Sequence, residues 1–397
     1  MTARGPNYPV RRVVALAVVV TVVGLAAVLV VSLLRTADPP VPDRRSGAGA
    51  KGDGGPPGSA RPRCDRDVGS EGVARFTRPI MIGVAGDQPE RAEALLTGPN
   101  PPGGIFVNSD IVAVDAPRWE SLARRHPDML LALDEEGGRV QRIDSIAGPL
   151  ASAASQGTVA QIREVAKKRA AALRSIGIGV DFAPVVDLRS PSSEAVIGDR
   201  SYGADASSVL RRAGAFARGL REGGVLPTLK HFPGHGRAAG AEGGDSHESA
   251  VSTPPLDELR GVDLVPYREL LRDRPVAVMV GHLVVPGLTA GRPSSLSPAA
   301  YRLLRSPTRS GGLGFDGLVF TDDLGDMAAV NEQFGPESAA VSAIAAGADV
   351  ALFHGEVDLA RIARVIASAE RNGTIAAGRL DDSARRIRAA AGCRAGQ

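Results

Sequence analysis

The sequence predicts an α/β protein whose folded part is a single (β/α)8 barrel. Between residues 71 and 392, eight short apolar runs alternate with stretches of helical periodicity. Apolar strands separated by helices indicate a parallel sheet that is buried on both faces. Eight such units are the number that closes a barrel. An open, doubly wound sheet is the alternative, but the chain has neither the GxGxxG fingerprint nor the P-loop of its nucleotide-binding forms.

The expected strands follow the apolar runs in chain order. They cover residues 79–85, 104–108, 129–134, 178–184, 225–231, 276–282, 317–322 and 349–354. Apolar residues recur near every 3.6 positions in 158–175, and 204–222 and 337–346 behave in the same way, so these segments are expected to be helices.

Polar residues stand where most of these strands end. They are Asn108, Asp134, Lys230, His231, His282, Asp322 and His354. Active sites of (β/α)8 barrels lie at the carboxyl ends of the strands. The repetition of polar residues at this one end therefore supports the barrel and predicts the location of its chemistry.

The densest group of ionisable residues follows the fifth expected strand. It comprises Lys230-His231-Phe232-Pro233-Gly234-His235-Gly236 and, after a Gly-rich spacer, Asp245 and His247. Proline and glycine exclude a helix here, so the group lies on a loop. Asp245 is close enough to His247 to fix one imidazole tautomer. A surface turn is the plain alternative. A zinc cluster is a second one, although no HExxH pattern is present.

The N-terminus predicts a location outside the cytoplasm. Three arginines precede an uncharged apolar run, residues 13–34, which is long enough to span a bilayer. By the positive-inside rule, residues 1–12 are cytoplasmic and the rest of the chain is extracytoplasmic. We therefore expect a single-pass signal anchor in the cell membrane. A cleaved signal peptide, which would release a secreted protein, is the alternative.

Residues 35–70 are rich in proline and glycine and are expected to form a disordered linker. Cys64 lies in this linker, and the other cysteine of the chain is Cys393. In an oxidising compartment these two residues are candidates for a disulfide, with two free thiols as the alternative. A net charge of +3 with dispersed arginines gives no indication of nucleic-acid binding.

Five motifs, in order along the chain, resemble those of glycoside hydrolase family 3. They are Asp134-Glu135-Glu136-Gly137-Gly138-Arg139-Val140-Gln141-Arg142, then the segments 182–187 and 197–203, then KHFPGHG with the later Asp-Ser-His, and last Thr321-Asp322-Asp323-Leu324 with Met327. The fourth motif resembles the β-N-acetylglucosaminidase (β-N-acetylhexosaminidase) branch of the family. The resemblance covers about residues 75–390, nearly all of the expected domain 71–392, and is to the single-domain form.

The resemblance implies a role for each motif residue. Asp322 would be the nucleophile, His247 the general acid/base and Asp245 the residue that orients His247. Substrate binding would fall to Asp134, Arg142, Arg200, Lys230, His231 and His282. No cofactor or metal is implied. Two departures from the family pattern are a longer spacer before Asp245, and Glu135 where the family often has glutamine.

The expected activity is that of a retaining exo-β-N-acetylglucosaminidase that acts through a covalent glycosyl-enzyme. Its substrate would be a GlcNAc-containing glycan or muropeptide, with GlcNAc-MurNAc from peptidoglycan as the expected source, and the enzyme would act as a monomer. A β-N-acetylglucosaminide phosphorylase and a non-catalytic, cell-surface glycan-binding barrel are the alternatives.

Overall fold

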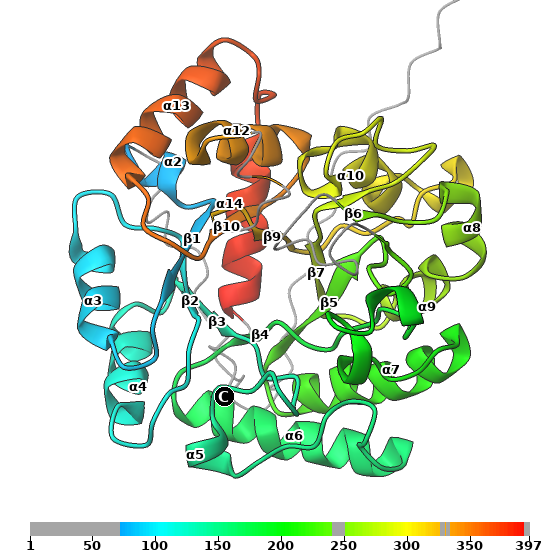
Figure 1. Ribbon diagram of the computed structural model, residues 1–397. Helices are drawn as coiled ribbons and strands as arrows, with labels where there is room; N and C mark the ends of the chain where they lie inside the picture. The colour runs from blue at the N-terminus through cyan, green and yellow to red at the C-terminus, as the bar shows by residue number, and fades with distance from the viewer. Residues whose placement is uncertain (1–71, 240–250, 326–329, 331–333, 393–397) are drawn as a thin grey trace, which may run out of the picture. The chain divides into compact units, whose positions relative to one another are not determined.

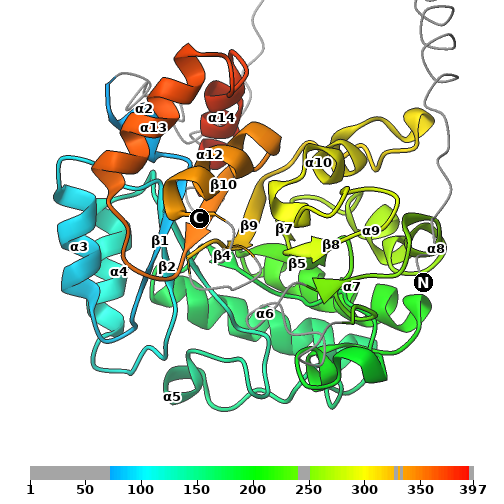
Figure 2. The ribbon, with the colours of Figure 1, turned by 45° about the horizontal axis from the view of Figure 1, so that its top comes forward.

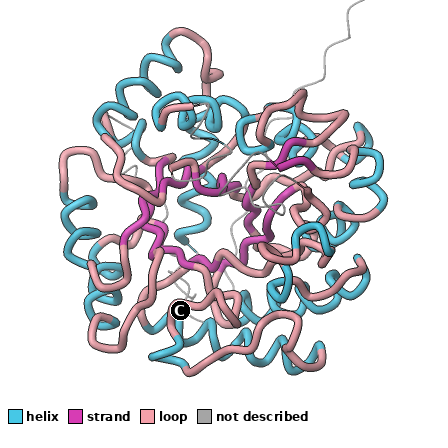
Figure 3. The backbone as a smooth tube through the Cα atoms, viewed as in Figure 1, coloured by secondary structure: helices cyan, strands magenta, loops and turns pink. Residues whose placement is uncertain are grey.

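The computed structural model describes residues 72–239, 251–325, 330 and 334–392. In this part of the chain, eight parallel strands close into a barrel in the order β1-β10-β9-β7-β5-β4-β3-β2. Figures 1 and 3 show the ring of strands inside a layer of helices. The predicted (β/α)8 fold is therefore confirmed.

All eight expected strands are present, each within a few residues of its expected bounds. They are β1 (Ile80–Val84), β2 (Gly104–Val107), β3 (Leu130–Leu133), β4 (Val180–Asp181), β5 (Leu226–Phe232), β7 (Ala277–Val280), β9 (Val319–Asp323) and β10 (Val350–Phe353). The sequence did not predict a small parallel sheet outside the barrel, formed by β6 (Val251–Ser252) and β8 (Leu283–Val284). Two-residue strands are too short to produce a periodic pattern.

Most helices of the described chain pack around this ring, and the last one fills one of its ends. The helices are α2 (Ala74–Thr77), α3 (Pro89–Thr97), α4 (Ala116–Arg125), α5 (Asp144–Ala147), α6 (Val159–Ser175), α7 (Ala206–Glu222), α8 (Leu256–Gly261), α9 (Leu264–Leu270), α10 (Pro298–Arg305), α12 (Pro336–Ala346), α13 (Leu359–Arg371) and α14 (Arg379–Gly392). The expected helices 158–175, 204–222 and 337–346 correspond to α6, α7 and α12. Thr158 and Gln161 form a capping box that sets the start of α6.

Alternate residues of the strands fill the inside of the barrel. The ring of Phe182 packs there between those of Phe106 and Phe320, with centroids 5.4 Å apart in a tilted pair and 5.0 Å apart in an edge-to-face pair. At the amino ends of the strands the filling comes from α14, because Ile387, with two alanines of that helix, belongs to the same apolar cluster. Figure 2 shows α14 beside α12 at this end. The last helix thus plugs one mouth of the barrel, and the polar strand ends lie at the other.

The loop after β3 is built on a buried acid. Glu135 is fully buried, and its Oε2 accepts the backbone N–H groups of Arg142 at 2.7 Å and Ile143 at 3.3 Å. Its own N–H donates to Asp181 Oδ1 at 2.9 Å, and Arg169 Nη1 lies 3.4 Å from Oε1. Glu135 therefore supports the loop and sets the position of its neighbours Asp134 and Glu136.

Burial governs the ionisation of both acids. It raises the pKa of Glu135 to about 7, against the opposing effect of the backbone donors and Arg169. It also raises the pKa of Asp181 well above its usual range. Both groups therefore keep a proton to a higher pH in the folded protein than in water.

Several predicted features lie outside the described residues. These are residues 1–12, the membrane segment 13–34, the linker 35–70, the proposed disulfide pair Cys64 and Cys393, and the pair Asp245 and His247. Within the described part of the chain, no helix is both long and apolar enough to cross a membrane.

Substituting Glu135 by glutamine should flatten the dependence of stability on pH. The folded pKa lies above the unfolded value of 4.5, so the contribution of Glu135 is complete below pH 4.5 and is lost as the pH rises through about 7. The free energy of unfolding of the wild type should therefore fall by about 3 kcal/mol more than that of Glu135→Gln over this interval. Urea unfolding at pH 4.5 and pH 8 measures the difference.

The matched control for this prediction is Glu164→Gln, since Glu164 is exposed on α6. This variant should follow the wild-type pH dependence. Parallel curves for the wild type and Glu135→Gln would contradict the assigned burial effect.

Candidate active site

A cavity of about 230 Å³ opens at the carboxyl ends of the strands. Six of its lining residues are predicted site residues: Asp134, Arg142, Arg200, Lys230, His231 and Asp322. They come from the ends of β3, β5 and β9 and from the loops that follow β3 and β4. The barrel thus brings together residues that are far apart in the sequence, at the end where polar residues were predicted to gather.

Lys230 lies at the centre of a buried charge network. Its Nζ is hydrogen-bonded to Asp134 Oδ1 and lies 2.6 Å from Glu136 Oε1. Glu136 also accepts two bonds from Arg200, at 2.8 Å from Nε and 2.7 Å from Nη2. The two cations and two carboxylates alternate, so their charges balance locally.

This network favours the charged forms of Glu136, Lys230 and Arg200. Burial opposes ionisation of Glu136, but Arg200 and Lys230 outweigh it and hold the pKa of Glu136 well below its usual range. Burial likewise opposes the charge of Lys230, but Asp134 and Glu136 outweigh it and raise the pKa of Lys230. At neutral pH these groups are fixed hydrogen-bond donors and acceptors. Such groups suit the hydroxyls of a neutral sugar.

Asp187 holds the end of β5 and the loop that follows it. Its Oδ2 accepts from His231 Nδ1 at 2.7 Å and from the His231 backbone N–H at 3.1 Å, and its Oδ1 accepts from the His235 N–H at 2.7 Å. Burial opposes the charge of Asp187, but His231 outweighs it and lowers the pKa of this carboxyl. The bond to Nδ1 fixes the tautomer of His231. Because His231 lines the cavity, its Nε2 is the ring nitrogen left to contact a ligand.

Asp322 is held by its neighbours at the end of β9. Its Oδ1 accepts the Asp323 N–H at 3.0 Å. Asp323 in turn accepts the N–H groups of Gly325 at 2.9 Å and His354 at 2.7 Å through Oδ1. These bonds tie the end of β9 to the end of β10. They leave Asp322 facing the cavity while Asp323 supports the backbone.

His282 is buried and does not line the cavity. Its Nε2 donates to the Asp323 carbonyl at 2.6 Å, and its Nδ1 is paired with the Ser295 hydroxyl at 2.6 Å. Both ring nitrogens are thus engaged within the protein. His282 supports the backbone beside Asp322, whereas a sugar contact was expected of it.

Sequence reasoning did not assign roles to Glu136, Asp187 or Asp323. Each lies inside one of the quoted motifs. Glu136 bonds Arg200, Asp187 bonds His231 and Asp323 bonds Asp322, and these three partners were predicted site residues. Membership of the motif was the available signal. Among the described residues, no group of three or more His, Cys, Asp or Glu side chains is arranged to hold a metal ion.

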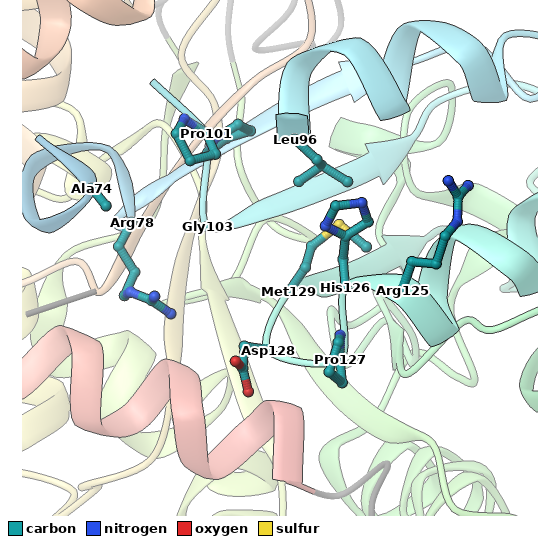
Figure 4. A pocket seen from close by; sticks show the side chains of 11 residues that line it. Ala74, Arg78, Leu96, Pro101, Gly103, Arg125, His126, Pro127, Asp128 and Met129 are labelled. Carbon is teal, nitrogen blue, oxygen red and sulfur yellow. The ribbon is translucent and has the colours of Figure 1, made fainter. Parts of the chain in front are cut away.

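A second cavity, of about 250 Å³, lies at the other end of the barrel (Figure 4). It includes Gly103 and Met129, which directly precede β2 and β3, together with Arg78, Arg125 and Asp128. None of the predicted site residues lines it. The cavity that contains Asp322 is therefore the candidate active site.

Known proteins resemble this chain over most of its length. The chain matches the glycosyl hydrolase family 3 N-terminal domain over residues 115–390. It is 47% identical over 292 residues to the beta-hexosaminidase LpqI of Mycobacterium tuberculosis, which covers 72% of this chain and 74% of that protein.

Two solved structures share the fold. A family 3 glycosyl hydrolase from Mycobacterium smegmatis aligns with a TM-score of 0.75 and 42% identity, over 82% of this chain and 98% of that one. A family 3 β-N-acetylglucosaminidase from Paenibacillus aligns with a TM-score of 0.71 and 30% identity, over 81% of this chain and 62% of that one. With its barrel, its motifs and these matches, the chain belongs to glycosyl hydrolase family 3.

Proposed function

We propose that this β-N-acetylhexosaminidase releases terminal β-linked GlcNAc with retention of configuration, using Asp322 as the nucleophile and His247 as the general acid/base. The observation that carries the proposal is that Asp322 lines one cavity with Asp134, Arg200, Lys230 and His231. A carboxylate at a strand end, facing a set of fixed sugar-binding donors and acceptors, is the arrangement that glycosyl transfer requires.

The reaction proceeds in two displacements. Asp322 attacks the anomeric carbon, the bond from that carbon to the leaving oxygen breaks, and the leaving oxygen takes a proton from His247. Water then attacks the anomeric carbon of the glycosyl ester, gives its proton to His247 and releases Asp322. Asp245 orients His247 throughout. Two inversions at one carbon give net retention.

The size of the described cavity supports removal of single sugars. About 230 Å³ is smaller than the range of pockets that hold drug-sized ligands. Such a cavity fits one sugar ring better than a run of several. This supports exo-action at the end of a glycan, and GlcNAc-MurNAc fragments of peptidoglycan are the proposed source.

A phosphorylase is the second candidate, and Arg142 is the observation that favours it. Arg200 and Lys230 line the cavity but are bonded to the carboxylates of Glu136 and Asp134. Arg142 also lines it, and the carboxylate of Asp110 is 3.8 Å away, beyond hydrogen-bond distance. Its Nη1 donates to the Gln141 carbonyl at 2.9 Å, whereas its Nε bonds no described residue, so this guanidinium keeps a donor for an incoming phosphate. The charges of Arg200 and Lys230 are balanced by carboxylates, which favours neutral water over phosphate as the acceptor.

Asp322→Asn should lose more than about 10³-fold in turnover of a nitrophenyl β-N-acetylglucosaminide, because the nucleophile is removed. His247→Ala should lose about 10²–10⁴-fold on a natural disaccharide. It should lose less on the nitrophenyl substrate, since that leaving group needs little protonation. Proton NMR should show the β-anomer of GlcNAc as the first product.

Asp316→Asn and His126→Ala are the controls for these variants, since both residues lie away from the cavity, and both should keep wild-type turnover. Azide should restore His247→Ala by forming the β-glycosyl azide, because azide needs no base. An α-anomer as the first product would refute retention. Glycan binding without turnover by the wild type would indicate the binding-protein alternative.

Turnover of GlcNAc-MurNAc by the wild type should be independent of phosphate and should give free GlcNAc, because water is the proposed acceptor. Mass spectrometry of the products with and without phosphate identifies the acceptor. GlcNAc 1-phosphate as the main product, with a rate that rises with phosphate and falls in Arg142→Gln, would establish the phosphorylase. Failure to cleave GlcNAc-MurNAc while chitobiose is cleaved would refute the peptidoglycan source.

We also propose that residues 13–34 anchor the enzyme in the cell membrane, with the barrel outside the cytoplasm. The full chain should sediment with membranes after an alkaline wash, and external protease should degrade the barrel in intact spheroplasts. Deleting residues 13–34 should abolish both results. A soluble product that lacks these residues at its N-terminus would show that the segment is cleaved.

A further inference from the structure

The amino ends of β9 and β10 carry a second buried charge cluster, at the opposite end of the barrel from Asp322. Asp349 immediately precedes β10 and is fully buried. Its carboxylate is bonded by three guanidinium groups: Arg305 Nη2 at 2.7 Å, Arg379 Nη2 at 3.0 Å and Arg386 Nη1 at 3.1 Å. One negative charge is therefore shared among three positive charges.

These arginines border a cavity of about 340 Å³ between α10, α12 and the start of α14. Arg302 also lines it, so four guanidinium groups and one carboxylate, that of Asp382, border the cavity, with Asp349 buried behind three of the arginines. Asp382 is bonded in addition to Arg385, 2.7 Å away. The cavity thus has an excess of positive charge.

Donors remain available in this cavity. Arg386 uses Nε for the Asp316 carbonyl and Nη1 for Asp349, and its Nη2 bonds no residue in the described part of the chain. The guanidinium of Arg302, on α10, likewise bonds none of the described residues. The side chains of Arg305, Arg379 and Arg386 are 19%, 13% and 19% exposed, so the cluster is open to the cavity.

The cluster also shows mutual repulsion. Burial lowers the pKa of Arg305, and the charges of Arg386 and Arg379 lower it further, against the effect of Asp349. An anion placed in the cavity would offset this repulsion. Guanidinium groups match the geometry of phosphate oxygens, to which they donate in pairs.

We propose that this cavity binds a phosphate group through Arg302 and Arg386, either as free phosphate or as the phosphate of an anionic lipid headgroup. Of these two donors, Arg386 is already oriented by its bond to Asp349. The site lies beside α14, at the barrel end away from the sugar-binding cavity, so it is distinct from any acceptor site for the reaction. Occupancy would bring one end of the barrel to a phosphate-bearing surface.

The test measures binding of inorganic phosphate and of dihexanoyl phosphatidylglycerol, below its micelle concentration, to the full chain in a non-ionic detergent. Isothermal titration calorimetry gives the dissociation constants at an ionic strength held constant with chloride. Arg302→Glu should weaken phosphate binding at least about tenfold, because it replaces a hydrogen-bond donor by a carboxylate whose negative charge repels the phosphate. Arg211→Glu on α7 is the matched control and should bind as the wild type does.

Turnover should be unchanged in Arg302→Glu, because this residue lies far from the active-site cavity. Tighter binding of the lipid than of phosphate would identify the headgroup as the source, and the reverse order would identify free phosphate. Absence of binding for both probes would overturn the proposal and leave the cluster as a device that holds α14 in place. Equal binding by Arg302→Glu and the wild type would also overturn it.

Discussion

The active-site end of the barrel depends on one buried ammonium group. Lys230 stands between Asp134 and Glu136, and Glu136 also binds Arg200. Two carboxylates without these cations would be strongly disfavoured in a dry interior, and the same holds for the cations alone. The network therefore fixes how β3, β5 and the loop after β4 meet. The hydroxyl-binding surface is a consequence of the way in which the protein satisfies its own buried charges.

Much of the barrel could be predicted from the sequence because its strands are buried on both faces. Such strands read as continuous apolar runs, and all eight stood out, as did the polar residues where they end. Asp134, Lys230 and Asp322 could be chosen because they stand at those ends within quoted motifs. The sequence could not show that the His282 side chain bonds the protein backbone. It also could not show which residues Glu136 and Asp187 bond. They depend on contacts between segments far apart in the chain, such as the bond from His282 to Asp323.

The two ends of the barrel use the same residue types to opposite effect. At the carboxyl end, Asp134 and Glu136 neutralise Lys230 and Arg200, which leaves a polar surface with little net charge. At the amino end, Asp349 is shared by Arg305, Arg379 and Arg386, which leaves an excess of positive charge. A neutral ligand suits the first arrangement and an anion suits the second. The two ends differ in net charge because the ratio of carboxylates to cations differs. The number of cations alone would not distinguish them.

The closure of the ring has a consequence for the order in which the protein is made. β1 pairs with β10, so the first strand of the barrel must wait for the last one before its edge is covered. The plug, α14, is later still in the chain. A nascent chain that lacks these segments exposes two open strand edges and an unfilled apolar mouth. The ring and its plug can therefore be completed only after the chain has been synthesised through α14, so closure of the barrel comes late in the synthesis of this domain.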